Sequence, residues 1–256
     1  MTDKALVILL AALVAIFAIS IVIETEAPVW AQKTKTKPKK KKTKSAKAYT
    51  EQGRKLLGRG LYVPAIRSFS AAIRKKPDWS EPRKLRGNAY TRIGAHTKAV
   101  NDYSKYIELQ PSDPRGYLMR ADANNFRGKH KEALEDYNKA ISMVPDWREA
   151  YLGRGLAYAG LEQYPKAIND YQWVLRLDPN HDEALGNMGR ACMLSGRPLT
   201  AVTHFERALL LARDPNWKRQ IQEWIDEIMN DPTIGKPHRA RPKYGKPGSR
   251  SSKPLW

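Results

Sequence analysis

The chain repeats one pattern of small, aromatic and proline residues every 34 positions between residues 46 and 215. An alanine comes first in the pattern, an aromatic ring follows four residues later, and a proline stands twelve residues after the alanine in four of the five copies. The alanines are Ala65, Ala99, Ala133, Ala167 and Ala201, and the rings are Phe69, Tyr103, Tyr137, Tyr171 and Phe205. A small residue lets two helices approach closely, a ring one turn later fills the gap beside it, and proline ends the helix. The pattern therefore predicts five helical hairpins that stack and bury one continuous core.

The same register predicts the bounds of each unit. The five units are 46–79, 80–113, 114–147, 148–181 and 182–215. We expect a first helix over about positions 2–14 of each unit and a second over about positions 18–31. Between the two helices, where a left-handed turn residue is needed, four units carry Gly60, Gly94, Gly128 and Gly196, and the fourth carries Glu162. A helix over 216–230, with Trp217, Ile221 and Trp224 on one face, is expected to cap the stack.

These units resemble the tetratricopeptide repeat. Position 8 is always small (Gly53, Gly87, Ala121, Gly155, Gly189), as in that family. At position 11, Asn124 replaces an expected ring in the third unit, which predicts either looser packing or a polar partner for Asn124. The resemblance covers about two-thirds of the chain. It implies an all-α, right-handed solenoid whose first helices line a concave groove, in the manner of a bacterial membrane-anchored or exported repeat protein.

The resemblance also implies which residues line the groove. In the N-terminal half they are Arg54, Lys84, Asn88, Arg92, Arg115, Asp122 and Asn125; in the C-terminal half they are Leu152, Leu156, Arg190 and Met193. A groove that is basic at one end and apolar at the other suits a peptide or helix with an acidic part and an apolar part. The alternative is that these are ordinary solvated helix faces.

Lys84 and Asn88 further resemble half of the clamp by which some chaperone-binding members grip a peptide carboxylate. The other clamp positions hold Met119, Glu149 and Gly153, so we do not expect that clamp to form.

No constellation for catalysis or metal binding stands out. The five histidines are scattered, and the single cysteine, Cys192, excludes an internal disulfide. We therefore expect a scaffold without enzymatic activity, cofactor or metal, which binds a protein partner in the groove. The pattern leaves its oligomeric state open.

The N-terminal region 1–31 contains an uncharged apolar run, Ala5–Ile23, that is long enough to cross a bilayer. One interpretation is a single-pass anchor in the cell membrane with the repeats on the cytoplasmic side. The other is a signal peptide cleaved after Ala31, which would export the protein to the periplasm. The length of the run slightly favours the anchor.

The chain is strongly basic, with a formal net charge of +20, and much of that charge lies in two low-complexity segments. These are the lysine-rich linker 32–45 and the tail 231–256, both expected to be disordered because they have little to bury. They suggest an alternative function, binding to an anionic surface or polymer such as acidic lipid or nucleic acid. No aromatic residues interleave with the linker lysines to stack on bases, which argues against nucleic acid.

Overall fold

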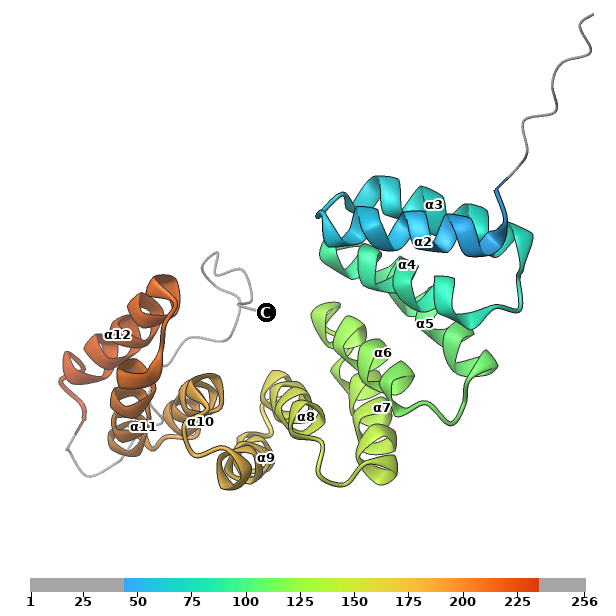
Figure 1. Cartoon of the computed structure of the whole chain (residues 1–256). Helices are drawn as coiled ribbons and strands as arrows, with labels where there is room; N and C mark the ends of the chain where they lie inside the picture. Colours follow the sequence, from blue (N-terminus) through green and yellow to red (C-terminus); the bar gives the residue numbers. More distant parts are fainter. Residues whose placement is uncertain (1–43, 235–256) are drawn as a thin grey trace, which may run out of the picture. The chain divides into compact units, whose positions relative to one another are not determined.

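The structure is a computed structural model that describes residues 44–234, which form eleven α-helices and no strand (Figure 1). The first helices of the five units are α2 (Ala46–Gly58), α4 (Ser80–Arg92), α6 (Pro114–Phe126), α8 (Arg148–Gly160) and α10 (Asp182–Leu194). The second helices are α3 (Tyr62–Lys75), α5 (His96–Leu109), α7 (His130–Met143), α9 (Tyr164–Leu177) and α11 (Pro198–Leu211), and α12 (Pro215–Met229) follows. The predicted all-α solenoid of five hairpins and a final helix is confirmed.

The apolar run Ala5–Ile23, nearly all of the lysine-rich linker and most of the tail lie outside the described residues. Among the helices of residues 44–234, none is long and apolar enough to cross a membrane.

Each hairpin closes where a ring lies over a small residue of its partner helix. The five alanines at position 20 have no exposed surface, and the five rings at position 24 are buried. A Cβ added to Gly87 would lie 2.5 Å from the Tyr103 ring, and one added to Gly53 would lie 2.4 Å from the Phe69 ring. These distances are far below van der Waals contact, so even an alanine at either of these two glycines would force the ring or the helices to shift.

The turn inside each hairpin needs one left-handed residue. The four predicted glycines have φ between 71° and 82°. Glu162 takes the same conformation in the fourth unit, with φ 59°, and is the one residue other than glycine with positive φ in the described chain. A side chain makes this conformation costly, so the fourth turn holds some backbone strain.

Successive units pack through two kinds of helix contact. Each second helix packs on the first helix of the next unit, from α3 on α4 to α9 on α10. First helices also contact one another, α2 with α4, α6 with α8, and α8 with α10. The surface that the first helices present is called here the inner face.

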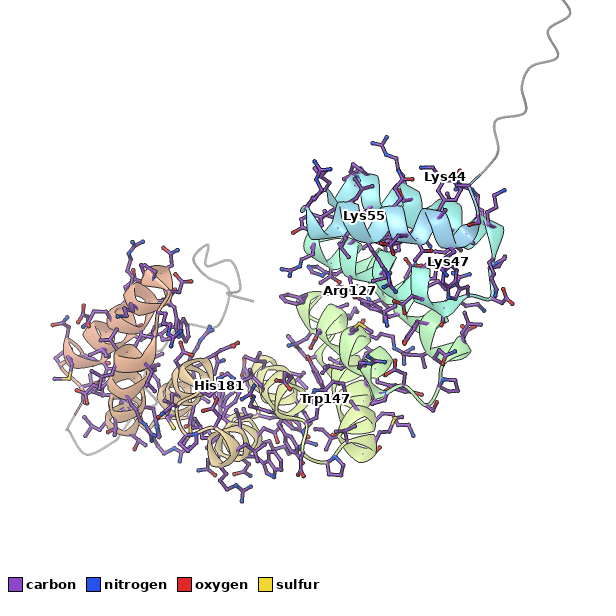
Figure 2. The ribbon with its side chains drawn as sticks, in the orientation of Figure 1. Lys44, Lys47, Lys55, Arg127, Trp147 and His181 are labelled. Atoms are coloured by element: carbon purple, nitrogen blue, oxygen red, sulfur yellow. The ribbon has the colours of Figure 1, made fainter. Side chains whose placement is uncertain are left out.

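Figure 2 draws the side chains of the described helices in the orientation of Figure 1. The joints between units 1–4 share a repeated arginine bridge. Arg120 on α6 binds both carboxylate oxygens of Asp136 on α7 at 2.8 Å, and it also donates to Ser104 on α5 at 3.1 Å. One guanidinium thus joins three helices from two units. The same bridge recurs 34 residues earlier and later: Arg86 with Asp102 and Ser70, and Arg154 with Asp170 and Asn138.

The core is divided, contrary to the expectation of one continuous core. Buried apolar residues form separate clusters at units 2–3, at units 3–4, and at units 4–5 together with α12. In the fifth unit Met188 and His204 replace the arginine and aspartate, and the last joint belongs to the largest apolar cluster.

Two smaller predictions can be settled. Asn124 is buried and its side-chain oxygen accepts a hydrogen bond from Arg127 at 2.9 Å, so it has the polar partner that was one of two alternatives. Helix α12 buries Ile221 and Ile228 completely. Its Trp217 ring lies 2.4 Å from where a Cβ on Gly186 would be, so α12 closes against the first helix of unit 5.

Candidate partner-binding surface

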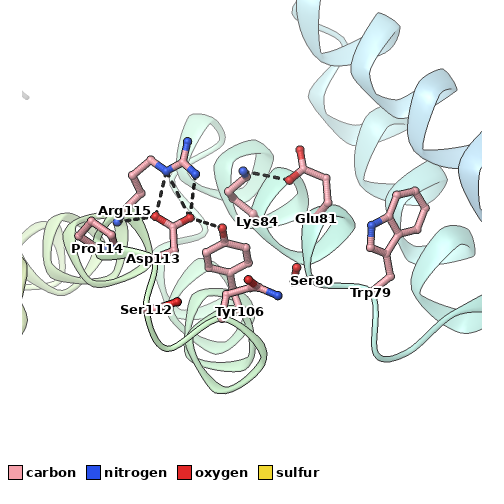
Figure 3. A pocket seen from close by; sticks show the side chains of 10 residues that line it. Trp79, Ser80, Glu81, Lys84, Tyr106, Ser112, Asp113, Pro114 and Arg115 are labelled. Carbon is pink, nitrogen blue, oxygen red and sulfur yellow. Dashed lines mark hydrogen bonds and ion pairs between the residues drawn. The ribbon is translucent and has the colours of Figure 1, made fainter.

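Two pockets lie on the inner face of units 1–3, one near the amino ends and one near the carboxyl ends of the first helices. The amino-end pocket, about 530 Å³, lies at the start of α4 and α6 (Figure 3) and is lined by Trp79, Ser80, Glu81, Lys84, Tyr106, Gln110, Ser112, Asp113, Pro114 and Arg115. The carboxyl-end pocket, about 400 Å³, lies at the end of α2 and α4 and is lined by Leu57, Tyr62, Asn88, Thr91, Arg92, Tyr103, Met119 and Asp122. Together they contain five of the eleven predicted groove residues.

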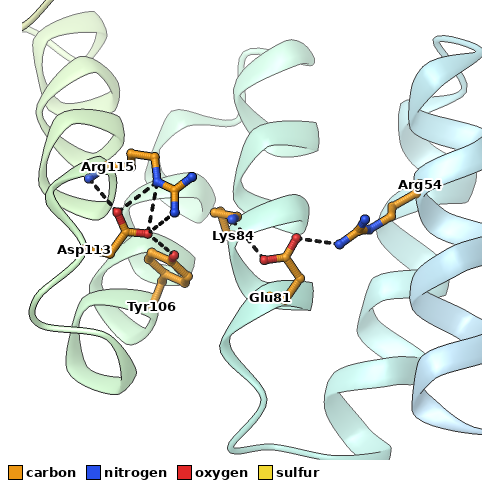
Figure 4. Close-up of polar contacts among 6 residues, drawn as sticks. All are labelled: Arg54, Glu81, Lys84, Tyr106, Asp113 and Arg115. Atoms are coloured by element: carbon orange, nitrogen blue, oxygen red, sulfur yellow. Dashed lines mark hydrogen bonds and ion pairs between the residues drawn. The ribbon is translucent and has the colours of Figure 1, made fainter.

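Glu81 organises the basic residues of the amino-end pocket. Its carboxylate binds Arg54 from α2 at 2.8 Å and Lys84 one turn further along α4 at 2.9 Å (Figure 4). The Lys84 ammonium also lies 5.5 Å from the centre of the Tyr106 ring, within the range of a cation–π contact. Two predicted groove cations therefore share one acid on the same surface.

Asp113 binds Arg115, a third predicted groove cation. It caps α6, accepting the Arg115 backbone N–H at 3.0 Å and the Arg115 Nε at 2.9 Å, and it also accepts a hydrogen bond from the Tyr106 hydroxyl. Burial acts to raise the pKa of Asp113, but the hydrogen bonds from Arg115 and Tyr106 outweigh it and lower that pKa to about 2. The amino-end pocket is therefore charge-balanced at neutral pH.

The carboxyl-end pocket is built on tyrosine hydroxyls. Tyr103 donates to the side-chain oxygen of Asn88 at 2.9 Å, and Tyr137, below the pocket, donates to Asp122 Oδ1 at 2.7 Å. Burial raises the pKa of Asp122 to about 6, although the bond from Tyr137 acts to lower it. Arg92 is exposed at the rim.

The remaining predicted groove residues lie largely in the packing of the solenoid. Asn125 is buried and hydrogen-bonded to His130 Nδ1 at 2.6 Å. Met193 is 4% exposed, and the Arg190 guanidinium lies 5.6 Å from the Trp224 ring of α12. Leu152 and Leu156 are partly buried and pack on the C-terminal core. The predicted apolar half thus has less free surface than the basic half.

Sequence reasoning did not single out the residues that fix these pockets. Glu81 and Leu57 stand at groove positions of the repeat, so their register was a usable signal. Tyr106 lies on the second helix of unit 2, and Asp113 lies in the turn between units 2 and 3. The packing of one unit on the next brings both residues to the inner face. No group of three or more His, Cys, Asp or Glu within residues 44–234 is arranged to hold a metal ion.

Comparison with known proteins agrees with this fold. Family models described as tetratricopeptide repeat match residues 50–114 and 149–181, and one described as TPR repeat matches residues 126–162. The chain belongs to the tetratricopeptide repeat family. No match was found among curated protein sequences.

Several solved tetratricopeptide repeat structures are similar to the chain. MamA 41-end from Desulfovibrio magneticus RS-1 is 26% identical, with 65% of this chain and 94% of that chain covered and a TM-score of 0.62. TTC0263, a thermophilic TPR protein in Thermus thermophilus, is 21% identical, with 71% and 99% covered and a TM-score of 0.58. YrrB, a TPR protein with an unusual peptide-binding site, is 17% identical, with 70% and 92% covered and a TM-score of 0.59. Tetratricopeptide repeat proteins are in general non-catalytic scaffolds for protein–protein interaction, and the fold supports that class of function here.

Proposed function

We propose that this protein is a non-catalytic scaffold that binds a segment of a partner protein along the inner face of units 1–3. The observation that carries the proposal is the pair of pockets on that face. Lys84 and Arg115 line one pocket, and Asn88, Arg92 and Asp122 line the other. Concave sites with a few fixed polar groups are where proteins usually bind their ligands. The peptide-binding site described for the structurally similar protein YrrB is in keeping with a peptide ligand.

The ion pairs on the inner face indicate which charges the bound segment carries. Arg54, Lys84 and Arg115 already contact acids of this chain, whereas Arg92 is exposed and forms no ion pair within residues 44–234. A purely acidic segment would have to compete with Glu81 and Asp113 for their cations. A segment of mixed charge fits better, with an acidic side chain at Arg92 and neutral polar groups over the amino-end pocket. Because Lys84, with a side chain 18% exposed, already binds Glu81, binding costs less side-chain ordering at Lys84.

Charge reversal on the inner face tests the proposal. In the full chain, Arg54→Glu, Lys84→Glu and Arg92→Glu are combined, and the matched control combines Arg67→Glu, Arg74→Glu and Lys76→Glu, which change the exposed surface of α3 and its end by the same charge. Each variant carries an affinity tag, and co-purifying proteins are quantified by mass spectrometry.

The inner-face variant is expected to lose its specific partners by about tenfold or more, since charges across an interface decide specificity. The α3 variant is expected to retain them. Partners that survive inner-face reversal would contradict the proposal. Equal losses in both variants would show that net charge, and not this surface, drives binding.

We also propose that the scaffold is held at a membrane by Ala5–Ile23, with export after cleavage behind Ala31 as the alternative. The support is the uncharged length of that run in the sequence, which lies outside the described residues. The N-terminal sequence and intact mass of the protein in membrane and soluble fractions test it. An intact N-terminus in the membrane fraction is expected, and a soluble form that begins at Gln32 would favour export.

A further inference from the structure

The carboxyl-end pocket holds a carboxylate that no cation neutralises. Asp122 accepts a hydrogen bond from Tyr137 through Oδ1 and forms no ion pair within residues 44–234. Its other oxygen, Oδ2, accepts no hydrogen bond from these residues and is not among their buried unpaired atoms, so it is open to the pocket. A desolvated carboxylate without a counter-charge is a costly feature, and it becomes favourable when a cation binds.

The buried aspartates of the solenoid show the contrast. Asp102, Asp136 and Asp170 each bind an arginine of the neighbouring helix through both oxygens, at 2.7–2.9 Å. The chain thus supplies its own cation to the aspartates that hold units together. At Asp122, on the inner face, residues 44–234 supply none.

The walls of the pocket fit a long alkyl chain. Leu57 at the end of α2, Tyr62 at the start of α3 and Met119 on α6 provide apolar and aromatic surface around Asp122. The Tyr103 hydroxyl is already hydrogen-bonded to Asn88 at 2.9 Å and to Thr91 at 3.2 Å. A ligand with an apolar stem and one cationic end satisfies both the walls and the carboxylate, and a lysine or arginine side chain has that form.

We propose that the carboxyl-end pocket receives a lysine or arginine side chain of the bound partner segment, with its charged end on Asp122 and its stem against Leu57, Tyr62 and Met119. This inference rests on the proposed function, because the side chain belongs to the segment bound on the inner face. Arg92 at the rim repels a second cation and attracts an acid. The segment therefore carries a basic residue with an acidic residue close to it.

Binding of the basic side chain strengthens as pH rises through about 6, where Asp122 loses its proton. The charged and titratable groups around it come from several helices: Tyr62 of α3, Arg92 of α4, Tyr103 of α5 and Tyr137 of α7. Burial raises the pKa of Tyr103 to about 12 and that of Tyr137 well above its usual value, and arginine stays charged. Glu149 on α8 is exposed and contacts Arg148. Tyr103 and Tyr137 therefore stay neutral near pH 6, where Asp122 changes charge.

Two small probes test the site on the full chain by NMR: N-acetyl-lysine methylamide and N-acetyl-norleucine methylamide, which share the stem and differ in the ammonium group. The readouts are the Asp122 13Cγ signal and the Met119 methyl signal. At pH 7.5 the lysine probe is expected to bind about tenfold more tightly than the norleucine probe, as for a charge-assisted hydrogen bond. That preference should fall away below pH 5.

Asp122→Asn is expected to abolish the preference for lysine, whereas Asp146→Asn, at an exposed turn, leaves it unchanged. Equal binding of both probes, or a lysine preference that survives Asp122→Asn, would overturn the inference. If the preference is absent but inner-face charge reversal still removes the partners, the pocket assignment fails and the proposed function stands. If the preference is present but the partners ignore charge reversal, the proposed function fails instead.

Discussion

The carboxylate of Asp122, which forms no ion pair within residues 44–234, leads to a specific prediction for stability. Its pKa rises from 3.8 to about 6 on folding, chiefly because burial penalises the charged form. An acid whose pKa is raised by folding destabilises the folded state once it ionises. Below pH 3.8 it is protonated in both states and has no effect. As pH rises towards 6 the unfolded chain loses the proton first, and stability falls.

The size of the effect follows from the shift. About two pKa units correspond to roughly 3 kcal/mol at pH values above 6. Asp122→Asn removes the charge and keeps an oxygen that can accept the Tyr137 hydroxyl, as Asn88 does for Tyr103 in the second unit. The variant is therefore expected to be more stable than the parent by up to about 3 kcal/mol at pH 8 and equally stable at pH 3.5.

Urea unfolding followed by circular dichroism at pH 3.5, 5, 6 and 8 measures this difference, because other titrating groups cancel between variant and parent. The reverse substitution, Asn88→Asp, is the matched control and is expected to lose stability over the same pH range. A gain that does not vary with pH, or a loss of stability in Asp122→Asn at pH 8, would refute the electrostatic reasoning.

Three further substitutions test the packing. Arg120→Met leaves Asp136 buried without its cation and is expected to lower the free energy of unfolding by about 3–5 kcal/mol in urea; adding Asp136→His, which recreates the fifth-unit pair, should recover most of the loss. Gly87→Ala places a Cβ 2.5 Å from a tyrosine ring and should lower the melting temperature, with a cost of about 1–3 kcal/mol, whereas Gly58→Ala meets nothing within 4 Å and should not. Glu162→Gly relieves a left-handed backbone and is expected to gain about 1 kcal/mol in the same thermal assay.

The hairpins could be predicted because their determinants lie at fixed offsets. A small residue at position 8, an alanine at position 20 and a ring at position 24 meet inside one unit, so a strict period reports their contact directly. The hydrogen bonds of the tyrosine hydroxyls also form inside one unit at a fixed spacing. Tyr103 and Tyr137 face Asn88 and Asp122, whereas in the first and fifth units a phenylalanine is paired with an arginine at the same positions. The fourth unit departs from this pairing, with Tyr171 opposite Leu156.

The inner face was less predictable because its chemistry depends on contacts between units. Arg54 was predicted as a groove residue, and the approach of α2 to α4 brings Glu81 to it, a contact that the register did not predict. Arg190, another predicted groove residue, lies with its guanidinium 5.6 Å from the Trp224 ring of α12, a contact that the repeat register does not show. Such contacts depend on the angle between neighbouring hairpins, which the repeat period does not encode.

The central claim is that a partner occupies the inner face of units 1–3, and site-specific photo-crosslinking tests it most directly. A photoreactive phenylalanine replaces Arg92 at the rim of the carboxyl-end pocket, and in a parallel protein it replaces Arg67 on the exposed side of α3. After irradiation in the cells that express the full chain, the account predicts a discrete protein adduct at position 92. That adduct should be lost when Lys84→Glu and Arg54→Glu are added, and it should be absent at position 67. Adducts that are the same at both positions, or found at position 67 alone, would contradict the account.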